Sequence, residues 1–166
     1  MSTIFKFTPE NQEKFVHILS LYPEKRAAML PTLHLAHQQN GYISSEVECY
    51  VADLLEISIV EVHEVTSFYT LFTERPMGHH HIRLCKSISC WICKADQIEE
   101  YLGNKLGISS GEITESGSFS WEAVPECLGA CEMAPMMQLG KDCYGPLTPD
   151  KVDQILETAS QSDNTA

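Results

Sequence analysis

The chain has 166 residues, of which 43% are hydrophobic and 20% are charged, and its formal net charge is −12 at pH 7. This size allows one domain or two small ones, and the composition is that of a soluble globular protein. The charge argues against nucleic acid as a partner because the 11 Lys and Arg residues are scattered.

Helical periodicity dominates the first 75 residues or so. Four amphipathic helices are predicted there, beginning at Thr8, Glu24, Ser45 and Ser58. The third and fourth carry capping boxes, formed by Ser45 with Glu48 and by Ser58 with Glu61. The second is predicted to end at Gln39, and the fourth near the break at residues 74–76.

The pattern changes after Gly78 to short strands and two helices. Strands are predicted at His81–Cys85, Ser118–Val124, Met136–Leu139 and around Cys143–Tyr144. One helix is predicted from Cys90 to Leu106 and another from Thr148-Pro149 onward. We therefore expect an α+β protein with an N-terminal helical bundle in residues 1–78, an α/β domain in residues 79–158 and a disordered tail in residues 159–166.

The compartment follows from the N-terminus and the cysteines. The start of the chain lacks the basic and apolar stretches of a secretory signal, and no apolar run approaches the roughly 18 residues that a membrane span requires. We therefore expect a cytoplasmic protein. Its seven cysteines are not expected to form disulfides there, because cytosolic thiols are kept reduced and an odd number leaves one unpaired. Metal or redox chemistry is the favoured explanation.

Four cysteines form two close pairs, Cys85 with Cys90 and Cys127 with Cys131. Four thiolates fit either tetrahedral zinc or a 2Fe-2S cluster. Zinc ribbons mostly place two residues between paired cysteines, whereas the gaps here are four and three. The spacing therefore favours a 2Fe-2S cluster on these four residues.

Two alternatives involve Cys93. With Cys85, Cys90 and Cys127 it matches the spacing of plant-type ferredoxins, and it would then replace Cys131 as a ligand. With Cys90 alone it forms a C-x-x-C at the start of a predicted helix, which is typical of thiol-disulfide oxidoreductases. Neither alternative explains the second pair around Gly129.

The stretch Glu126-Cys-Leu-Gly-Ala-Cys-Glu-Met-Ala-Pro135 closely resembles the thioredoxin-like 2Fe-2S subunit of respiratory complex I. The run from Tyr144 to Leu156 resembles the same family. So do residues 22–31, 41–44 and 62–69 in the N-terminal part, so that the resemblance covers nearly the whole chain.

The resemblance implies a helical bundle followed by a thioredoxin-like ferredoxin domain that binds a 2Fe-2S cluster. Its ligands would be Cys85, Cys90, Cys127 and Cys131. Cys93 and Cys143 are additional to the family's four-ligand pattern.

The resemblance also implies a partner flavoprotein that carries FMN, binds NADH and exchanges one electron at a time with the cluster. The absence of a GxGxxG loop from this sequence agrees with that division. The expected assembly is an NADH:quinone oxidoreductase on the cytoplasmic face of the inner membrane, with no complete active site in this chain alone. NAD-linked hydrogenases and formate dehydrogenases, a free ferredoxin-like carrier and a thiol-redox protein are the alternatives, and the helical bundle is expected to dock on the partner.

The remaining candidate ligands are interpreted structurally. Cys49 and Cys143 are predicted to lie in the core, and His79–His81 to form a solvated linker. Met133, Met136 and Met137 are expected to pack near the cluster or in the core. No ligand role is assigned to the helical residues His34, His37 and His63.

Overall fold

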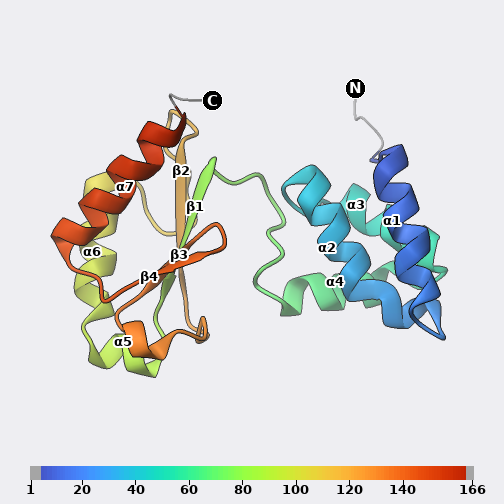
Figure 1. Ribbon diagram of the computed structural model, residues 1–166, viewed down its shortest axis with the longest axis horizontal. Coiled ribbons are helices and arrows are strands. Elements are labelled where there is room, and N and C mark those ends of the chain that lie inside the picture. The colour runs from blue at the N-terminus through green and yellow to red at the C-terminus, as the bar shows by residue number, and fades with distance from the viewer. Residues whose placement is uncertain (1–4, 164–166) are drawn as a thin grey trace. The chain divides into compact units, whose positions relative to one another are not determined.

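Two units, divided between Pro76 and Met77, make up the chain in the computed structural model, which describes residues 5–163 (Figure 1). Each unit has its own cluster of buried apolar side chains. The division lies close to the Pro and Gly residues at which the sequence changes character. No helix within residues 5–163 is long and apolar enough to cross a bilayer.

The N-terminal unit is helical, as predicted. It contains α1 (Pro9–Ser20), a short 3-10 helix (Lys25–Ala28), α2 (Met29–Asn40), α3 (Ser45–Leu55) and α4 (Ile59–Phe68). Its core is formed by apolar side chains from all four α-helices, among them Phe15, Leu33, Val51 and Val62. The amphipathic periodicity of this part of the sequence thus corresponds to a real packed face.

Several N-terminal details differ from the prediction. The α-helical part of the second helix begins at Met29, which leaves Pro31 in its first turn, where a missing N–H costs nothing. Helix α3 is capped by Ser44, whose side chain accepts a hydrogen bond from the Val47 N–H, and not by Ser45 with Glu48. The capping box of α4 at Ser58 is confirmed, but this helix ends at Phe68, well before the predicted break.

Glu48 takes part in the interior instead of in a cap. Its side chain is 8% exposed and accepts hydrogen bonds from the Thr66 hydroxyl at 2.5 Å and from Nδ1 of His63 at 3.1 Å. These contacts join α3 to α4 through one carboxylate. A buried carboxylate is tolerated only with such partners.

The C-terminal unit is a four-stranded mixed sheet with helices. Its elements are β1 (His80–Cys85), α5 (Ile88–Ile92), α6 (Ala95–Leu106), β2 (Phe119–Val124), a 3-10 helix (Cys131–Met133), β3 (Met137–Leu139), β4 (Asp142–Tyr144) and α7 (Pro149–Asp163). The strand order is β2-β1-β3-β4. Strands β1 and β2 are parallel, whereas β3 runs antiparallel to both β1 and β4. The predicted strands are all present.

The two faces of this sheet differ in chemistry. Helices α6 and α7 lie on one side of the sheet (Figure 1). Ile82 and Leu84 point to this side, where they pack with Leu102 and Val152. Because side chains alternate along a strand, the intervening residues of β1, including Arg83, point to the opposite face. The sheet therefore has one apolar face and one that carries charged side chains.

Three C-terminal predictions are wrong in part. The predicted helix at residues 90–106 is broken into α5 and α6 at Lys94, whose φ of +67° is incompatible with a continuous α-helix. His80 and His81 belong to β1 and not to a solvated linker, and Nδ1 of His81 lies 2.9 Å from the Ser120 hydroxyl. Residues 159–163 of the predicted disordered tail continue α7, in which Ala159 is buried; residues 164–166 lie outside the described part of the chain.

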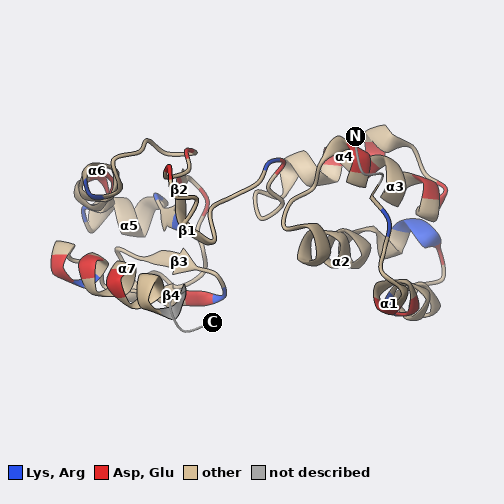
Figure 2. Ribbon diagram, turned by 90° about the horizontal axis from the view of Figure 1, so that it is seen from above, with Lys and Arg blue, Asp and Glu red and all other residues tan. Residues whose placement is uncertain are grey.

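Acidic side chains recur along α7 and on α3 and α4 (Figure 2). Both units thus contribute to the negative charge of the chain. The excess of acidic over basic residues is therefore spread over several helices and is not confined to one acidic segment.

The contact between Glu48 and His63 predicts a titration. The hydrogen bond and charge of Glu48 raise the pKa of His63, opposed by partial desolvation. The protonated ring therefore stabilises the helical unit below the unfolded-state pKa of about 6.5, and this contribution is lost as pH rises through the folded-state pKa. In an NMR titration, we expect His63 to titrate above that value and Glu48→Gln to lower its pKa. A His63 pKa unchanged by Glu48→Gln would contradict the assignment.

Candidate metal centre

The four cysteines of the predicted site come from three segments, namely the end of β1, α5 and the loop between β2 and β3. These segments lie at one end of the sheet (Figure 1). Cys85 is the last residue of β1, and Cys90 lies in α5, which follows directly. Cys127 and Cys131 lie in the loop between β2 and β3. Because β1 and β2 are parallel, the segments that follow them leave the sheet at the same end.

Backbone hydrogen bonds hold the loop of residues 125–136 against the end of β1. The Cys85 N–H donates to the Met136 carbonyl at 3.1 Å, and the Lys86 N–H donates to the Val124 carbonyl at 2.8 Å. The Cys85 thiol also lies 3.7 Å from the carbonyl oxygen of Glu126. Both ends of the loop are therefore fixed beside the first cysteine pair.

The two pairs differ in burial. Cys85 and Cys90 are 2% and 1% exposed and pack with Ala95 and Met136 in a small apolar cluster, whereas Cys127 and Cys131 are exposed. Met136 therefore packs beside the cysteines, which is one of the two positions expected for the methionines. Met137 takes the other position, in the core between the sheet and the helices. The centre is dry on one side and open to the surface on the other.

The thiols of Cys90, Cys127 and Cys131 have pKa values that are shifted by burial or by neighbouring groups. The pKa of the Cys90 thiol is raised to about 11, chiefly by burial; a backbone hydrogen bond from Met136 opposes this shift, and Cys85 and Cys131 add to it. The pKa of Cys131 is raised first by Cys127 and also by Cys85. The Gly129 N–H, followed by Cys131, lowers the pKa of Cys127. Thiolates gathered in this way repel one another unless a cation joins them.

The donor set fits a dinuclear iron-sulfur cluster. The sulfurs of Cys127 and Cys131 are 3.2 Å apart, and Cys85 and Cys90 form the second pair. Within residues 5–163, no three His, Cys, Asp or Glu side chains are grouped so that they could hold one metal ion. Two pairs of thiolates are the donor set that a 2Fe-2S cluster requires.

Two glycines shape the cysteine loop. Gly129 has a φ of +87°, and its N–H points to the Cys127 sulfur at 3.4 Å. Gly145 lies against the short helix that begins at Cys131, and a Cβ at this position would be 2.0 Å from the Met133 carbonyl oxygen. The loop therefore requires a left-handed residue at Gly129 and the absence of a side chain at Gly145, which packs against it from the segment after β4.

The other cysteines lie at the surface. Cys49 and Cys143 are exposed, so the prediction that they lie in the core is wrong. In α3 the inward positions are taken by Val47, Val51 and the buried Glu48. Cys93 is also exposed, at the end of α5, although Cys90 one turn earlier is buried.

The surface beside the centre is apolar, a feature that the sequence pattern did not single out. Ile88, Trp91 and Ile92 of α5 are 68%, 55% and 68% exposed, while Cys90 on the same short helix is buried. The signal was present in the sequence as three large apolar residues around one cysteine. We name Ile88, Trp91 and Ile92 the α5 surface.

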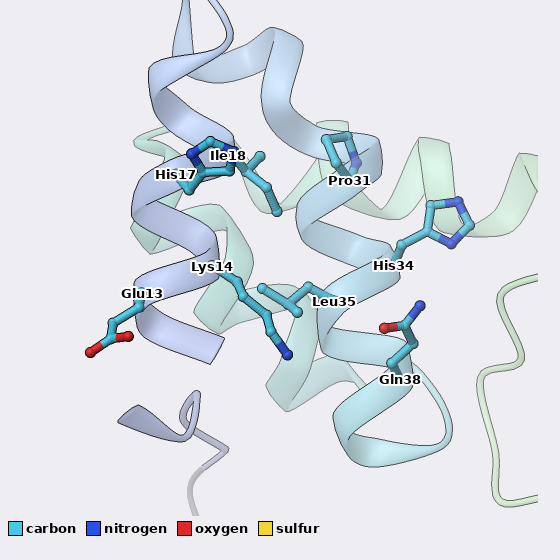
Figure 3. Close-up of a pocket in the computed structure, with 8 residues that line it drawn as sticks. All are labelled: Glu13, Lys14, His17, Ile18, Pro31, His34, Leu35 and Gln38. Carbon is cyan, nitrogen blue, oxygen red and sulfur yellow. The ribbon is translucent and has the colours of Figure 1, made fainter. Parts of the chain in front are cut away.

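A separate groove of about 620 Å³ lies between α1 and α2 of the helical unit (Figure 3). Ile18, Pro31 and Leu35 provide its apolar wall, and the exposed His17 and His34 lie on opposite sides of it. No cysteine is among the residues that line it. The groove is therefore lined by residues of the helical unit alone.

The sequence and fold match known proteins over most of the chain. Residues 15–160 match the family model of the thioredoxin-like 2Fe-2S ferredoxins. An NADH-quinone oxidoreductase subunit of Rhizobium meliloti (strain 1021) is 42% identical over 137 residues, which cover 82% of this chain and 81% of that protein. An NADH-quinone oxidoreductase subunit of Rickettsia bellii (strain RML369-C) is 39% identical over 158 residues, covering 93% and 94%.

Among solved structures, the fold is similar to a chain of an NAD+-reducing NiFe-hydrogenase in the H2-reduced state. The TM-score is 0.66 at 16% identity, and the match covers 80% of this chain but only 22% of that one. At this identity, the match supports the likeness of fold alone.

The contact at Gly145 predicts a selective defect. Gly145→Ala would force the Cys131–Met133 turn to move, because a Cβ would overlap the Met133 carbonyl. We expect iron content to fall at least about tenfold while far-UV circular dichroism stays largely unchanged. Gly103→Ala in α6 is the control, since its nearest contacts are at an ordinary 3.5 Å. Equal iron content in both variants would contradict this role of Gly145.

Proposed function

The chain belongs to the thioredoxin-like 2Fe-2S ferredoxin family, and from this premise we propose that it is an electron-transfer subunit with one cluster on Cys85, Cys90, Cys127 and Cys131. The observation that carries the proposal is that two cysteine pairs, from three segments of the chain, lie at the same end of the sheet. The proposed electron partner is the FMN of an NADH-oxidising subunit in an NADH:quinone oxidoreductase.

The chain's own residues bind and shield the cofactor. A 2Fe-2S cluster supplies one-electron redox chemistry, and its potential depends on charge, hydrogen bonds to sulfur and solvent exposure. The apolar cluster formed by Ala95, Met136, Cys85 and Cys90 keeps water from one side. The Gly129 N–H is placed to donate to the sulfur of Cys127. The exposed pair leaves the opposite side accessible to a partner.

The thiol-redox alternative is disfavoured by the state of Cys90. A C-x-x-C oxidoreductase activates its first cysteine by lowering the pKa and leaving the sulfur accessible. Here Cys90 is 1% exposed and its pKa is raised to about 11. Its environment suits a buried ligand better than an attacking thiolate.

The proposed docking region for the partner includes the α5 surface. Short-range electron exchange requires the partner's cofactor to approach the exposed cysteine pair, and the α5 surface lies beside it: Ser89 of α5 interacts with the sulfur of Cys131. Apolar and aromatic side chains of this kind are typical anchors of protein interfaces. The helical unit offers further exposed apolar residues, notably Val60 and Phe68, for the docking role proposed for residues 1–78.

The proposed cellular setting follows from the same assembly. With no membrane-spanning helix in residues 5–163, attachment to a membrane would come from the partner subunits. We place the chain on the cytoplasmic face of the inner membrane, as a peripheral part of the complex. Neither this chain nor its cluster would complete an active site without the flavoprotein.

The ligand set is tested by metal analysis of anaerobically purified full-length chain. We expect two irons and two acid-labile sulfides per chain and, after dithionite reduction, the paramagnetic resonance signal of one unpaired spin. Serine at Cys85, Cys90, Cys127 or Cys131 should abolish or strongly alter this signal. Cys93→Ser is the matched control and should preserve it. Loss of the cluster in Cys93→Ser with retention in Cys131→Ser would instead establish the plant-type ligand set.

The partner is tested by copurification and by reduction with NADH. An FMN-carrying, NADH-oxidising protein should copurify with the chain and reduce its cluster when NADH is added. Trp91→Ala should weaken this association by roughly 30-fold, the loss typical of an interface aromatic anchor. Ile113→Ala, which alters an exposed apolar residue between α6 and β2, outside the proposed docking regions, should leave it unchanged. Equal affinities would exclude the α5 surface from the interface.

A further inference from the structure

Arg83 and Cys85 share a face of β1. They are two residues apart on the strand, so their side chains point to the same side of the sheet, with a separation of roughly 6.5 Å along the strand. The residues that alternate with them, Ile82 and Leu84, pack in the core under α6 and α7. The cationic side chain of Arg83 is therefore the neighbour of the Cys85 side chain on the same face of the strand.

Arg83 is held by two carboxylates. Its Nε donates to Oε1 of Glu122 at 3.1 Å, and its Nη2 donates to Oε1 of Glu126 at 2.9 Å. Glu122 is directly opposite Arg83 in the parallel register of β1 and β2. The Arg83 side chain is only 15% exposed. A fork that is largely removed from water keeps both contacts with defined geometry.

The Glu122 carboxylate is ionised in this environment. Burial alone would raise its pKa, but the contacts with His81 and Arg83 outweigh burial and lower it. Nε2 of His81 lies 3.5 Å from Oε1 of Glu122, and the same ring contacts Ser120 through its other nitrogen. The cation of Arg83 is therefore matched by a carboxylate that the neighbouring strand holds in place.

The second contact reaches the cysteine loop. Glu126 immediately precedes Cys127, and its own carbonyl oxygen lies 3.7 Å from the Cys85 sulfur. The side chain of Glu126 is thus bound to β1 through Arg83, while its backbone lies between two of the proposed ligands. A displacement of Glu126 would move Cys127 and the acceptor beside Cys85 together.

We propose that Arg83 is a positioning residue for the iron-sulfur centre, fixing the Cys127 loop through Glu126 and supplying a positive charge on the cysteine face of β1. The inference rests on the proposed function for its redox consequence, but the loop contact can be tested without a cluster. It gives a role to a residue outside the cysteine motifs.

The two effects have different signatures. Loosening of the loop should speed the loss of iron whichever partner of the ion pair is removed. The electrostatic effect depends on sign: reduction adds negative charge to the centre, so removal of a cation lowers the midpoint potential and removal of an anion raises it. A purely structural role would not reverse direction between the two partners.

Three variants and one control separate these effects in the full-length chain. Arg83→Gln removes the cation, Glu126→Gln removes the anion, and Arg83→Lys keeps the charge without the fork. Lys105→Gln is the matched control, because it breaks an ion pair with Asp153 at 3.0 Å in the same unit without involving the cysteine segments. Iron release to a chelator and the midpoint potential are measured for each.

We expect Arg83→Gln and Glu126→Gln to release iron roughly tenfold faster than the unmodified chain, as follows when one partner of a partly buried ion pair is lost. Arg83→Gln should lower the midpoint potential and Glu126→Gln should raise it. Arg83→Lys should have the midpoint potential of the unmodified chain, but it should release iron at a rate between those of the unmodified chain and Arg83→Gln. Lys105→Gln should change neither quantity. Shifts of equal sign in the two glutamine variants, or release as slow as in Lys105→Gln, would overturn the proposal.

A measurement on the metal-free chain keeps this test separate from the proposed function. Amide hydrogen exchange of residues 125–131 should be faster in Arg83→Gln than in Lys105→Gln even without iron. If the unmodified chain binds no 2Fe-2S cluster, the proposed function fails, and this exchange experiment alone decides whether Arg83 fixes the loop. Unchanged exchange in an iron-binding chain would refute the role of Arg83 while leaving the proposed function intact.

Discussion

The structure of the C-terminal unit depends on the hydrogen bonds that fix the loop of residues 125–136 to the end of β1. The Cys85 N–H bonds to Met136 and the Lys86 N–H to Val124, so both ends of the loop are tied to one strand. Without these bonds, the two cysteine pairs would belong to segments far apart in the sequence with no common position. The parallel pairing of β1 with β2 makes this arrangement possible, since both strands deliver their following segments to the same end of the sheet.

The two cysteine pairs of the centre differ in burial. The pair Cys85 and Cys90 lies in an apolar environment that disfavours free thiolates, which makes a metal the natural partner for these sulfurs. The pair Cys127 and Cys131 lies at the surface, beside the exposed apolar residues of α5. A redox centre that must exchange electrons with another protein needs both conditions: protection from water on one side and access on the other.

The charged face of the sheet gives this arrangement a second support. Arg83 connects the middle of β1 with Glu122 on β2 and with Glu126 at the start of the cysteine loop. On the other side of Cys85, Lys86 is bound by Asp96 and Glu99 of α6. Residues on either side of Cys85 are therefore anchored by ion pairs to different elements, and the pair with Glu126 limits the freedom of the cysteine loop.

The sequence by itself determined the two-part organisation, the order of helices and strands and the composition of the cysteine pairs, because periodicity, capping residues and ligand spacing are local properties. It did not determine which way Glu48, Cys49 and Cys143 face, or that the helix after Cys90 breaks at Lys94. Those outcomes depend on packing. Glu48 is buried because Thr66 and His63 of another helix donate hydrogen bonds to its carboxylate, and the neighbouring Cys49 consequently points to the surface. The Arg83–Glu126 contact was equally hidden, since only the pairing of β1 and β2 places these distant residues together. Tertiary structure decided such contacts because they join residues that no sequence period relates.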